Sequence, residues 1–97
     1  MRITWDDGKS ETNIVERGFD FAFAAAIFAG PITDRVDDRR DYGEVRHVAV
    51  GQAAGVALTV VYTDRMAEDG TIERRIISAR VSNRREREEF QKAQSEV

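Results

Sequence analysis

Several residue types are missing or scarce in this chain of 97 residues, and each scarcity excludes a class of site. The chain contains no cysteine, so disulfide bonds, thiolate nucleophiles and zinc–thiolate sites are excluded. Its single histidine, His47, excludes a metal site built on two histidines and a cleavage mechanism that needs a histidine pair within one chain. Acid–base chemistry would have to come from other side chains.

Long apolar runs are missing as well. The longest, residues 21–29, is too short to span a bilayer, which takes about 20 apolar residues. The first five residues lead directly into a charged segment and do not resemble a signal peptide. We therefore expect a cytoplasmic protein without a membrane segment. We also expect a single domain over residues 1–97, whose one modest core buries about 60–65% of the unfolded surface.

The net charge of −3 argues mildly against a nucleic-acid-binding protein, but the charges are unevenly distributed. Residues 1–45 carry six basic and ten acidic side chains, whereas residues 71–97 carry seven basic and five acidic ones. The basic end could neutralise the acidic half across the fold, or it could form a local positive patch. The sequence leaves both arrangements open.

Two helices are expected in the first third of the chain. The first begins after an N-cap at Asp6 or Asp7, runs to about residue 17 and ends at Gly18, a suitable C′ residue. It is mostly polar, so we expect it to lie on the surface, held by three apolar side chains: Trp5, Ile14 and Val15. The second covers residues 21–29 and is apolar nearly all round, so we expect it to be the main partner of a sheet.

A third helix is expected at the C-terminal end. Asn83 precedes Glu86 by three residues, which is a capping-box arrangement. Phe90 is the only large apolar anchor of this helix.

Strands are expected at residues 2–5, 32–38, 45–51, 56–65 and 71–81. The predicted fold class is α+β. Two N-terminal helices pack on one face of an antiparallel β-meander of about four strands, and a C-terminal helix follows.

The strand at residues 71–81 carries three arginines among apolar residues. Strict alternation places Arg74 and Arg80 on one face and Arg75 on the other. A guanidinium beside a packed core is unfavourable unless it meets an anion. These arginines either pair with the chain's own carboxylates or bind an outside phosphate or carboxylate, and the sequence does not decide between the two.

Three stretches of the chain each carry a distinctive set of residues at characteristic positions. The first contains Trp5-Asp6, Lys9, Asn13, Gly18, Phe21, Ala24, Phe28 and Pro31. The second contains Tyr42-Gly43-Glu44, Arg46 and Gly51. The third contains Val61-Tyr62-Thr63-Asp64-Arg65 and Arg75-Ile76-Ile77-Ser78-Ala79-Arg80, followed by Arg84, Glu86 and Arg87. In these motifs, which cover nearly the whole chain, the sequence resembles the BrnT toxin family.

The resemblance implies a type II toxin, a small ribonuclease with a RelE-like fold that cleaves RNA without a metal or other cofactor. The implied partner is a BrnA-like antitoxin with a ribbon-helix-helix DNA-binding part, which occludes the toxin in an assembly such as a heterotetramer. That complex represses its own operon, so operator DNA is contacted only through the antitoxin.

Two departures from the family pattern affect groups that could move protons. The family usually has Lys-His-Gly where this chain has Glu16-Arg17-Gly18, and it often has Tyr at the position of Phe90. These changes support a second hypothesis: a catalytically weak binding module whose main role is to pair with its antitoxin and act as a co-repressor.

Cleaving RNA requires a base near the 2′-hydroxyl, a cation at the phosphorane and a proton for the leaving oxygen. The catalytic candidates that the resemblance and the residue chemistry offer are Lys9, Arg17, Arg65, Arg75 and Arg80. The candidates for RNA contacts are Tyr62, Arg84, Arg85 and Arg87. Arginine stays charged and binds phosphate with two N–H groups, so it suits transition-state stabilisation.

Each candidate also has an ordinary structural interpretation. The arginines could pair with nearby acids, Tyr62 could be a core residue, and the arginines of the last helix could form a solvated face. Carboxylate partners for Arg65, Arg75 and Arg80 would favour the binding module, and a positive cleft without them would favour the ribonuclease.

Overall fold

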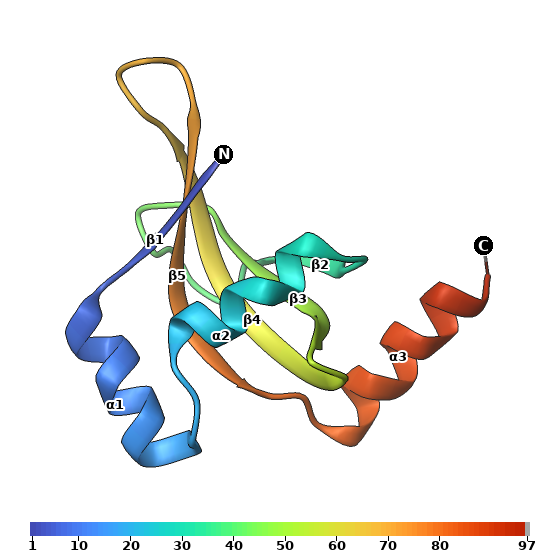
Figure 1. Cartoon of the computed structure of the whole chain (residues 1–97). Helices are drawn as coiled ribbons and strands as arrows, with labels where there is room; N and C mark the ends of the chain where they lie inside the picture. Colours follow the sequence, from blue (N-terminus) through green and yellow to red (C-terminus); the bar gives the residue numbers. More distant parts are fainter. Residues whose placement is uncertain (97) are drawn as a thin grey trace.

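The computed structural model describes residues 1–96 and contains one sheet of five strands (Figure 1). The strands are β1 (Arg2–Trp5), β2 (Thr33–Asp37), β3 (Arg46–Ala53), β4 (Val56–Met66) and β5 (Ile72–Val81). They lie in the order β1-β5-β4-β3-β2, in which β2 to β5 are antiparallel neighbours and β1 runs parallel to β5.

The α+β class is confirmed and β2 to β5 form an antiparallel meander, but the sheet has five strands instead of about four. The sheet is mixed because residues 2–5 pair with residues 73–76 of β5 and extend the sheet at that edge. This pairing lets Ile3 and Trp5 pack against the buried core. Local sequence alternation alone does not indicate the pairing of β1 with β5.

The helices are α1 (Asp7–Arg17), α2 (Phe21–Ala25), the 3₁₀ helix η1 (Ala26–Ala29) and α3 (Arg84–Ser95). The caps predicted for α1 are confirmed, since the Asp6 side chain accepts from the Lys9 backbone N–H and Gly18 adopts a φ of 86°. Figure 1 shows α2 and η1 lying across the sheet, whereas α1 stands to one side and contacts α2 and β5. No helix among residues 1–96 has the length and apolar character needed to cross a membrane.

The attachment of α1 differs from the expected one. Ile14 and Val15, which we expected to hold the helix in place, are 49% and 86% exposed. Ser10 and Asn13 are buried instead, and each forms a 2.9 Å hydrogen bond to the backbone of residues 19–21. Polar contacts therefore fix α1, and two apolar side chains stay in solvent.

The core lies between the sheet and α2–η1, on a side that we call the α2 face. Its buried members are Phe21, Ala24, Ile27, Ala49, Ala53, Leu58, Val60, Tyr62, Ile76 and Ala79. The second predicted helix divides into an α-helical turn and a 3₁₀ turn, and Phe23 is 37% exposed, so this segment is not buried on all sides although it is apolar nearly all round.

The other side of the sheet, which we call the α3 face, is partly covered by α3. The predicted capping box is confirmed because the side chains of Asn83 and Glu86 bond reciprocally to each other's backbone N–H groups. Phe90 is 4% exposed, and α3 contacts β3.

A β-bulge changes which arginines share a face. The register between β4 and β5 shifts by one residue, so Ile77 has no direct partner on β4. Arg75 lies opposite Thr63 and Arg80 opposite Thr59, and these two threonines are on the same face of β4. The prediction that Arg75 and Arg80 point to opposite faces is therefore wrong, because strict alternation ignores the extra residue.

Candidate functional site

Three of the predicted catalytic residues meet in one hollow of about 510 Å³, which we call the arginine hollow. Its lining consists of Lys9, Glu44, Val45, Arg46, Thr63, Asp64, Arg65, Arg75 and Ile77. Four of these side chains are basic and two are acidic, so the hollow combines the charge needed to hold a phosphate with carboxylates that can accept a proton.

Four separate elements position these side chains. Arg75 and Arg65 come from neighbouring strands near the β4–β5 hairpin, and Lys9 comes from the first turn of α1. The segment that enters β3 supplies Glu44 and is fixed to β4 by a 2.8 Å hydrogen bond from the Thr63 hydroxyl to the carbonyl of Val45. The hollow thus forms where distant parts of the chain converge.

Arg75 is exposed and, within residues 1–96, forms no ion pair with a carboxylate. Its neighbour Arg74, by contrast, binds Asp64 with two hydrogen bonds of 2.8 and 2.9 Å. Lys9 also forms no ion pair with a described carboxylate. Arg75 and Lys9 therefore have charges that are available to an outside anion.

Arg65 does have a carboxylate partner. Its Nη2 lies 2.8 Å from Oε1 of Glu73, and Arg2 binds the second oxygen of the same carboxylate at 2.6 Å. The hydrogen bonds from Arg65 and then Arg2 lower the pKa of Glu73. The Arg65 side chain is nevertheless 62% exposed, so it can still present N–H groups to the hollow.

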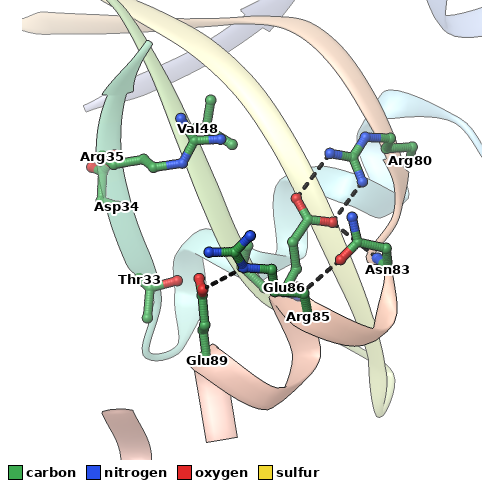
Figure 2. Close-up of a pocket in the computed structure, with 10 residues that line it drawn as sticks. Thr33, Asp34, Arg35, Val48, Arg80, Asn83, Arg85, Glu86 and Glu89 are labelled. Atoms are coloured by element: carbon green, nitrogen blue, oxygen red, sulfur yellow. Dashed lines mark hydrogen bonds and ion pairs between the residues drawn. The ribbon is translucent and has the colours of Figure 1, made fainter. Parts of the chain in front are cut away.

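Arg80 is bound more completely than Arg65. Its Nη1 and Nη2 donate to the two oxygens of Glu86 at 2.6 and 2.8 Å, and the first of these oxygens also accepts from the Asn83 backbone N–H (Figure 2). The hydrogen bond from Arg80 is the largest influence that lowers the pKa of Glu86 to about 2. Arg80 therefore fixes the first turn of α3 to β5.

Arg80 belongs to a second hollow of about 620 Å³ on the α3 face, which we call the α3 hollow. Its lining consists of Thr33, Asp34, Arg35, Val48, Val50, Arg80, Asn83, Arg85, Glu86 and Glu89 (Figure 2). The structure therefore separates Arg80 from the three candidates of the arginine hollow, although Arg65, Arg75 and Arg80 lie on one face of the sheet.

Arg17 lies apart from both hollows. Its Nη1 donates to the backbone carbonyl of Ala79 at 2.8 Å and to Oδ1 of Asn13 at 3.3 Å. These bonds connect α1 to β5, so the structure favours a packing role over a catalytic one.

The arginines predicted to contact RNA on α3 have local partners. Arg84 pairs with Glu88 at 2.9 Å and Arg85 with Glu89 at 3.2 Å, both at helical i,i+4 spacing. Arg87 donates from its Nη1 to the backbone carbonyl of Ser82 at 2.7 Å. Of the three arginines only Arg85 lines a described hollow, so most of this cluster is a solvated helix face.

Tyr62 lies in the core and is 1% exposed. Its ring stacks on that of His47 with centroids 5.0 Å apart, and its hydroxyl donates to Asp34. Burial, and then the hydrogen bond to Asp34, raise the pKa of the phenol. The structure therefore favours the core interpretation of Tyr62 over an RNA contact.

Sequence reasoning missed several charged residues of the α3 face. Asp37, for which the sequence indicated no role, is 4% exposed and accepts two hydrogen bonds from the Arg39 guanidinium, of 2.8 and 2.9 Å. The hydrogen bond from Arg39 lowers the pKa of Asp37 to about 2. The burial of Asp37 depends on the fold and left no signal in the sequence.

Glu44 and Arg46 were noted in the sequence only as members of the family motifs. The structure places both in the arginine hollow, joined by a 3.2 Å contact between Arg46 Nε and Glu44 Oε1. Among residues 1–96 there is no group of three or more His, Cys, Asp or Glu side chains arranged to hold a metal ion.

Comparison with known proteins agrees with the resemblance found in the sequence. A family model described as the ribonuclease toxin, BrnT, of type II toxin–antitoxin systems matches residues 5–86 and so includes every residue of the arginine hollow. No curated protein matches the chain. Because the family match spans most of its length, the chain belongs to the BrnT family of ribonuclease toxins of type II toxin–antitoxin systems.

Proposed function

We propose that this toxin is a metal-independent endoribonuclease that acts on RNA in the cytoplasm and places the scissile phosphate in the arginine hollow. The observation that carries the proposal is Arg75, an exposed guanidinium without a carboxylate partner among residues 1–96. It shares the hollow with Lys9 and Arg65. Arg75 lies beside these other cations and pairs with no described carboxylate, so its guanidinium is suited to bind an external phosphate.

The chemistry follows from these side chains. The RNA 2′-oxygen attacks phosphorus and forms a 2′,3′-cyclic phosphate, while the bond from phosphorus to the 5′-oxygen breaks. The Glu44 carboxylate takes the proton of the 2′-hydroxyl, and the Lys9 ammonium gives a proton to the leaving 5′-oxygen. Arg75 binds two phosphate oxygens and stabilises the extra negative charge of the phosphorane, with help from Arg65.

The test compares Arg75→Ala with the matched control Arg84→Ala, which also removes one exposed arginine. We expect Arg75→Ala to lower the rate of RNA cleavage by about 10²–10³-fold, as when one preorganised donor to a transition state is lost. Arg84→Ala should cleave at the wild-type rate. The wild-type rate should be unchanged by EDTA, and the products should carry 2′,3′-cyclic phosphate ends.

The readouts are growth after induced expression, total RNA on a gel and a circular dichroism spectrum that confirms folding. A folded Arg75→Ala variant that still arrests growth and degrades RNA at equal expression would remove Arg75 from the mechanism. Loss of cleavage in EDTA would contradict the metal-independent mechanism.

A second function is favoured by two of the ion pairs. Membership of a type II toxin–antitoxin family implies an antitoxin partner, and Arg65 and Arg80 are each bound to a carboxylate, as expected of a catalytically weak binding module. In this alternative the chain pairs with a BrnA-like antitoxin, for example as a heterotetramer, and reaches operator DNA only through the antitoxin's ribbon-helix-helix part. Intact RNA after expression of folded wild-type protein, together with operator binding by the co-purified complex, would support it.

A further inference from the structure

The two hollows lie next to each other on the α3 face. Strand β3 contributes Arg46 to the arginine hollow and Val48 and Val50 to the α3 hollow. Strand β5 likewise contributes Arg75 to the first and Arg80 to the second. Arg46 and Val48 are two residues apart, or about 7 Å at about 3.4 Å per residue. A nucleotide whose phosphate occupies the arginine hollow can therefore place its neighbour at the α3 hollow.

The α3 hollow has an apolar floor beside a free cation. Val48 and Val50 are 6% and 7% exposed. Arg35 lies directly opposite Val48 on the neighbouring strand and extends over it (Figure 2). Within residues 1–96, Arg35 is exposed and forms no ion pair with a carboxylate. An apolar surface beside a guanidinium plane is an arrangement on which an unpaired base can stack.

The opposite wall supplies hydrogen-bonding groups. Arg85 and Glu89 of α3 face the hollow and are joined by one exposed contact of 3.2 Å, which exchanges readily with other partners (Figure 2). Together they offer donors and acceptors for the edge of a base. The volume of about 620 Å³ falls in the range of about 300–1,000 Å³ that is typical of small-ligand sites.

The lining of this hollow contains three arginines and three acidic residues. Arg80 pairs with Glu86 and Arg85 with Glu89, so among residues 1–96 Arg35 is the arginine of this hollow that has no carboxylate partner. A negatively charged ligand with a flat ring satisfies both Arg35 and the apolar floor. On the basis of the proposed ribonuclease function, we propose that the α3 hollow binds the nucleotide that flanks the cleaved bond, and that Arg35 makes this nucleotide a determinant of the cleavage site.

The experiment measures binding and cleavage separately. Fluorescein-labelled eight-nucleotide RNAs, one for each homopolymer sequence, carry 2′-O-methyl groups that prevent cleavage and are titrated with protein that keeps Arg75. We expect Arg35→Ala to weaken binding of the preferred RNA about 10-fold, as expected when base stacking is lost. Lys92→Ala, which removes one exposed cation of α3 outside both hollows, should change binding by less than about 2-fold.

In the protein with Arg75 intact, cleavage sites are mapped on a messenger RNA by primer extension. We expect Arg35→Ala to flatten the nucleotide preference beside the cut and to raise KM more than it lowers kcat. Unchanged binding and an unchanged cleavage map in Arg35→Ala would overturn the proposal. If the wild type cleaves no RNA, the ribonuclease proposal fails, and the binding titration still decides whether Arg35 contacts RNA.

A protein partner is the competing occupant of the α3 hollow. If Arg35→Ala weakens binding of the antitoxin and leaves RNA affinity unchanged, the hollow belongs to the toxin–antitoxin interface and the nucleotide site is wrong. If Arg35→Ala weakens RNA binding alone, the result supports the nucleotide site.

Discussion

Arg75 and Arg80 lie on the same face of the sheet although they are five positions apart in β5. Strict alternation would place them on opposite faces, but the bulge at Ile77 adds one residue between them and restores a common direction. As a consequence, the arginine hollow and the α3 hollow open on one surface instead of on two sides of the molecule.

The two arginines nevertheless have different surroundings. Arg75 has no carboxylate partner among residues 1–96, whereas Arg80 donates to both oxygens of Glu86. A phosphate can reach Arg75 without breaking an ion pair, whereas at Arg80 it would compete with the carboxylate of Glu86, which accepts from both Nη atoms. This difference supports the proposal that Arg75 binds the phosphate, and it favours Arg80 as the residue that positions α3.

The ion pair of Glu86 with Arg80 makes stability depend on pH in the acid range. The pKa of Glu86 is lowered from 4.5 to about 2, so its contribution is complete above about pH 4.5 and is lost as the pH falls towards about 2. We expect Glu86→Gln to lower the free energy of unfolding by about 1–2 kcal/mol at neutral pH. The value is small because Arg80 is 44% exposed and water screens the pair.

Urea unfolding of both proteins between pH 2.5 and 7 measures this difference. Glu73 and Asp37 also have lowered pKa values, but they titrate in both proteins and cancel in the comparison. Glu88→Gln, which alters an exposed pair on the same helix, is the control and should have little effect. A difference for Glu86→Gln that stays constant down to pH 2.5 would show that the carboxylate charge is not what stabilises α3.

The sequence predicted the features that depend on neighbouring residues. The Asp6 and Asn83 caps and the end of α1 at Gly18 were found because capping needs only a few adjacent positions. The parallel pairing of β1 with β5 was missed, because it joins residues about 70 positions apart and leaves no local pattern. The bulge at Ile77 was also missed, since it appears only when β5 is aligned with β4.

The candidate site shows the same limit. The family motifs indicated Lys9, Arg65 and Arg75, which do share a hollow. Which arginines are neutralised could not be predicted, because charged residues make up 34% of the chain and each arginine has several acids to choose from. Only the three-dimensional structure assigns Glu86 to Arg80 and no described carboxylate to Arg75.

Position 51 has no room for a side chain larger than that of glycine, because Ile27 of η1 and Ile32 pack against it. A Cβ at this position would lie 2.9 Å from Cβ of Ile27 and 3.0 Å from Cγ2 of Ile32, and Ile27 is fully buried. We expect Gly51→Ala to lower the free energy of unfolding by about 1–3 kcal/mol, since a packed core accommodates added volume only with strain. Chemical denaturation of the purified protein measures the change.

Gly30→Ala provides the matched control. Nothing lies within 4 Å of a Cβ built on Gly30, and its φ of −126° suits any residue. It should change stability by less than about 0.5 kcal/mol or raise it slightly. Equal losses in the two variants would mean that the contact with Ile27 does not limit the side chain at position 51.

The structure favours the core interpretation of Tyr62 over an RNA contact, and Tyr62→Phe tests this interpretation. The phenol is buried, and its raised pKa keeps it protonated near neutral pH, so it lies outside the arginine hollow as a donor to Asp34. We expect Tyr62→Phe to cleave RNA within about 3-fold of the wild-type rate and to lose about 1 kcal/mol of stability with the hydrogen bond. A rate more than 10-fold lower in a folded Tyr62→Phe protein would instead place the phenol in the reaction, and the core would have to open for RNA to reach it.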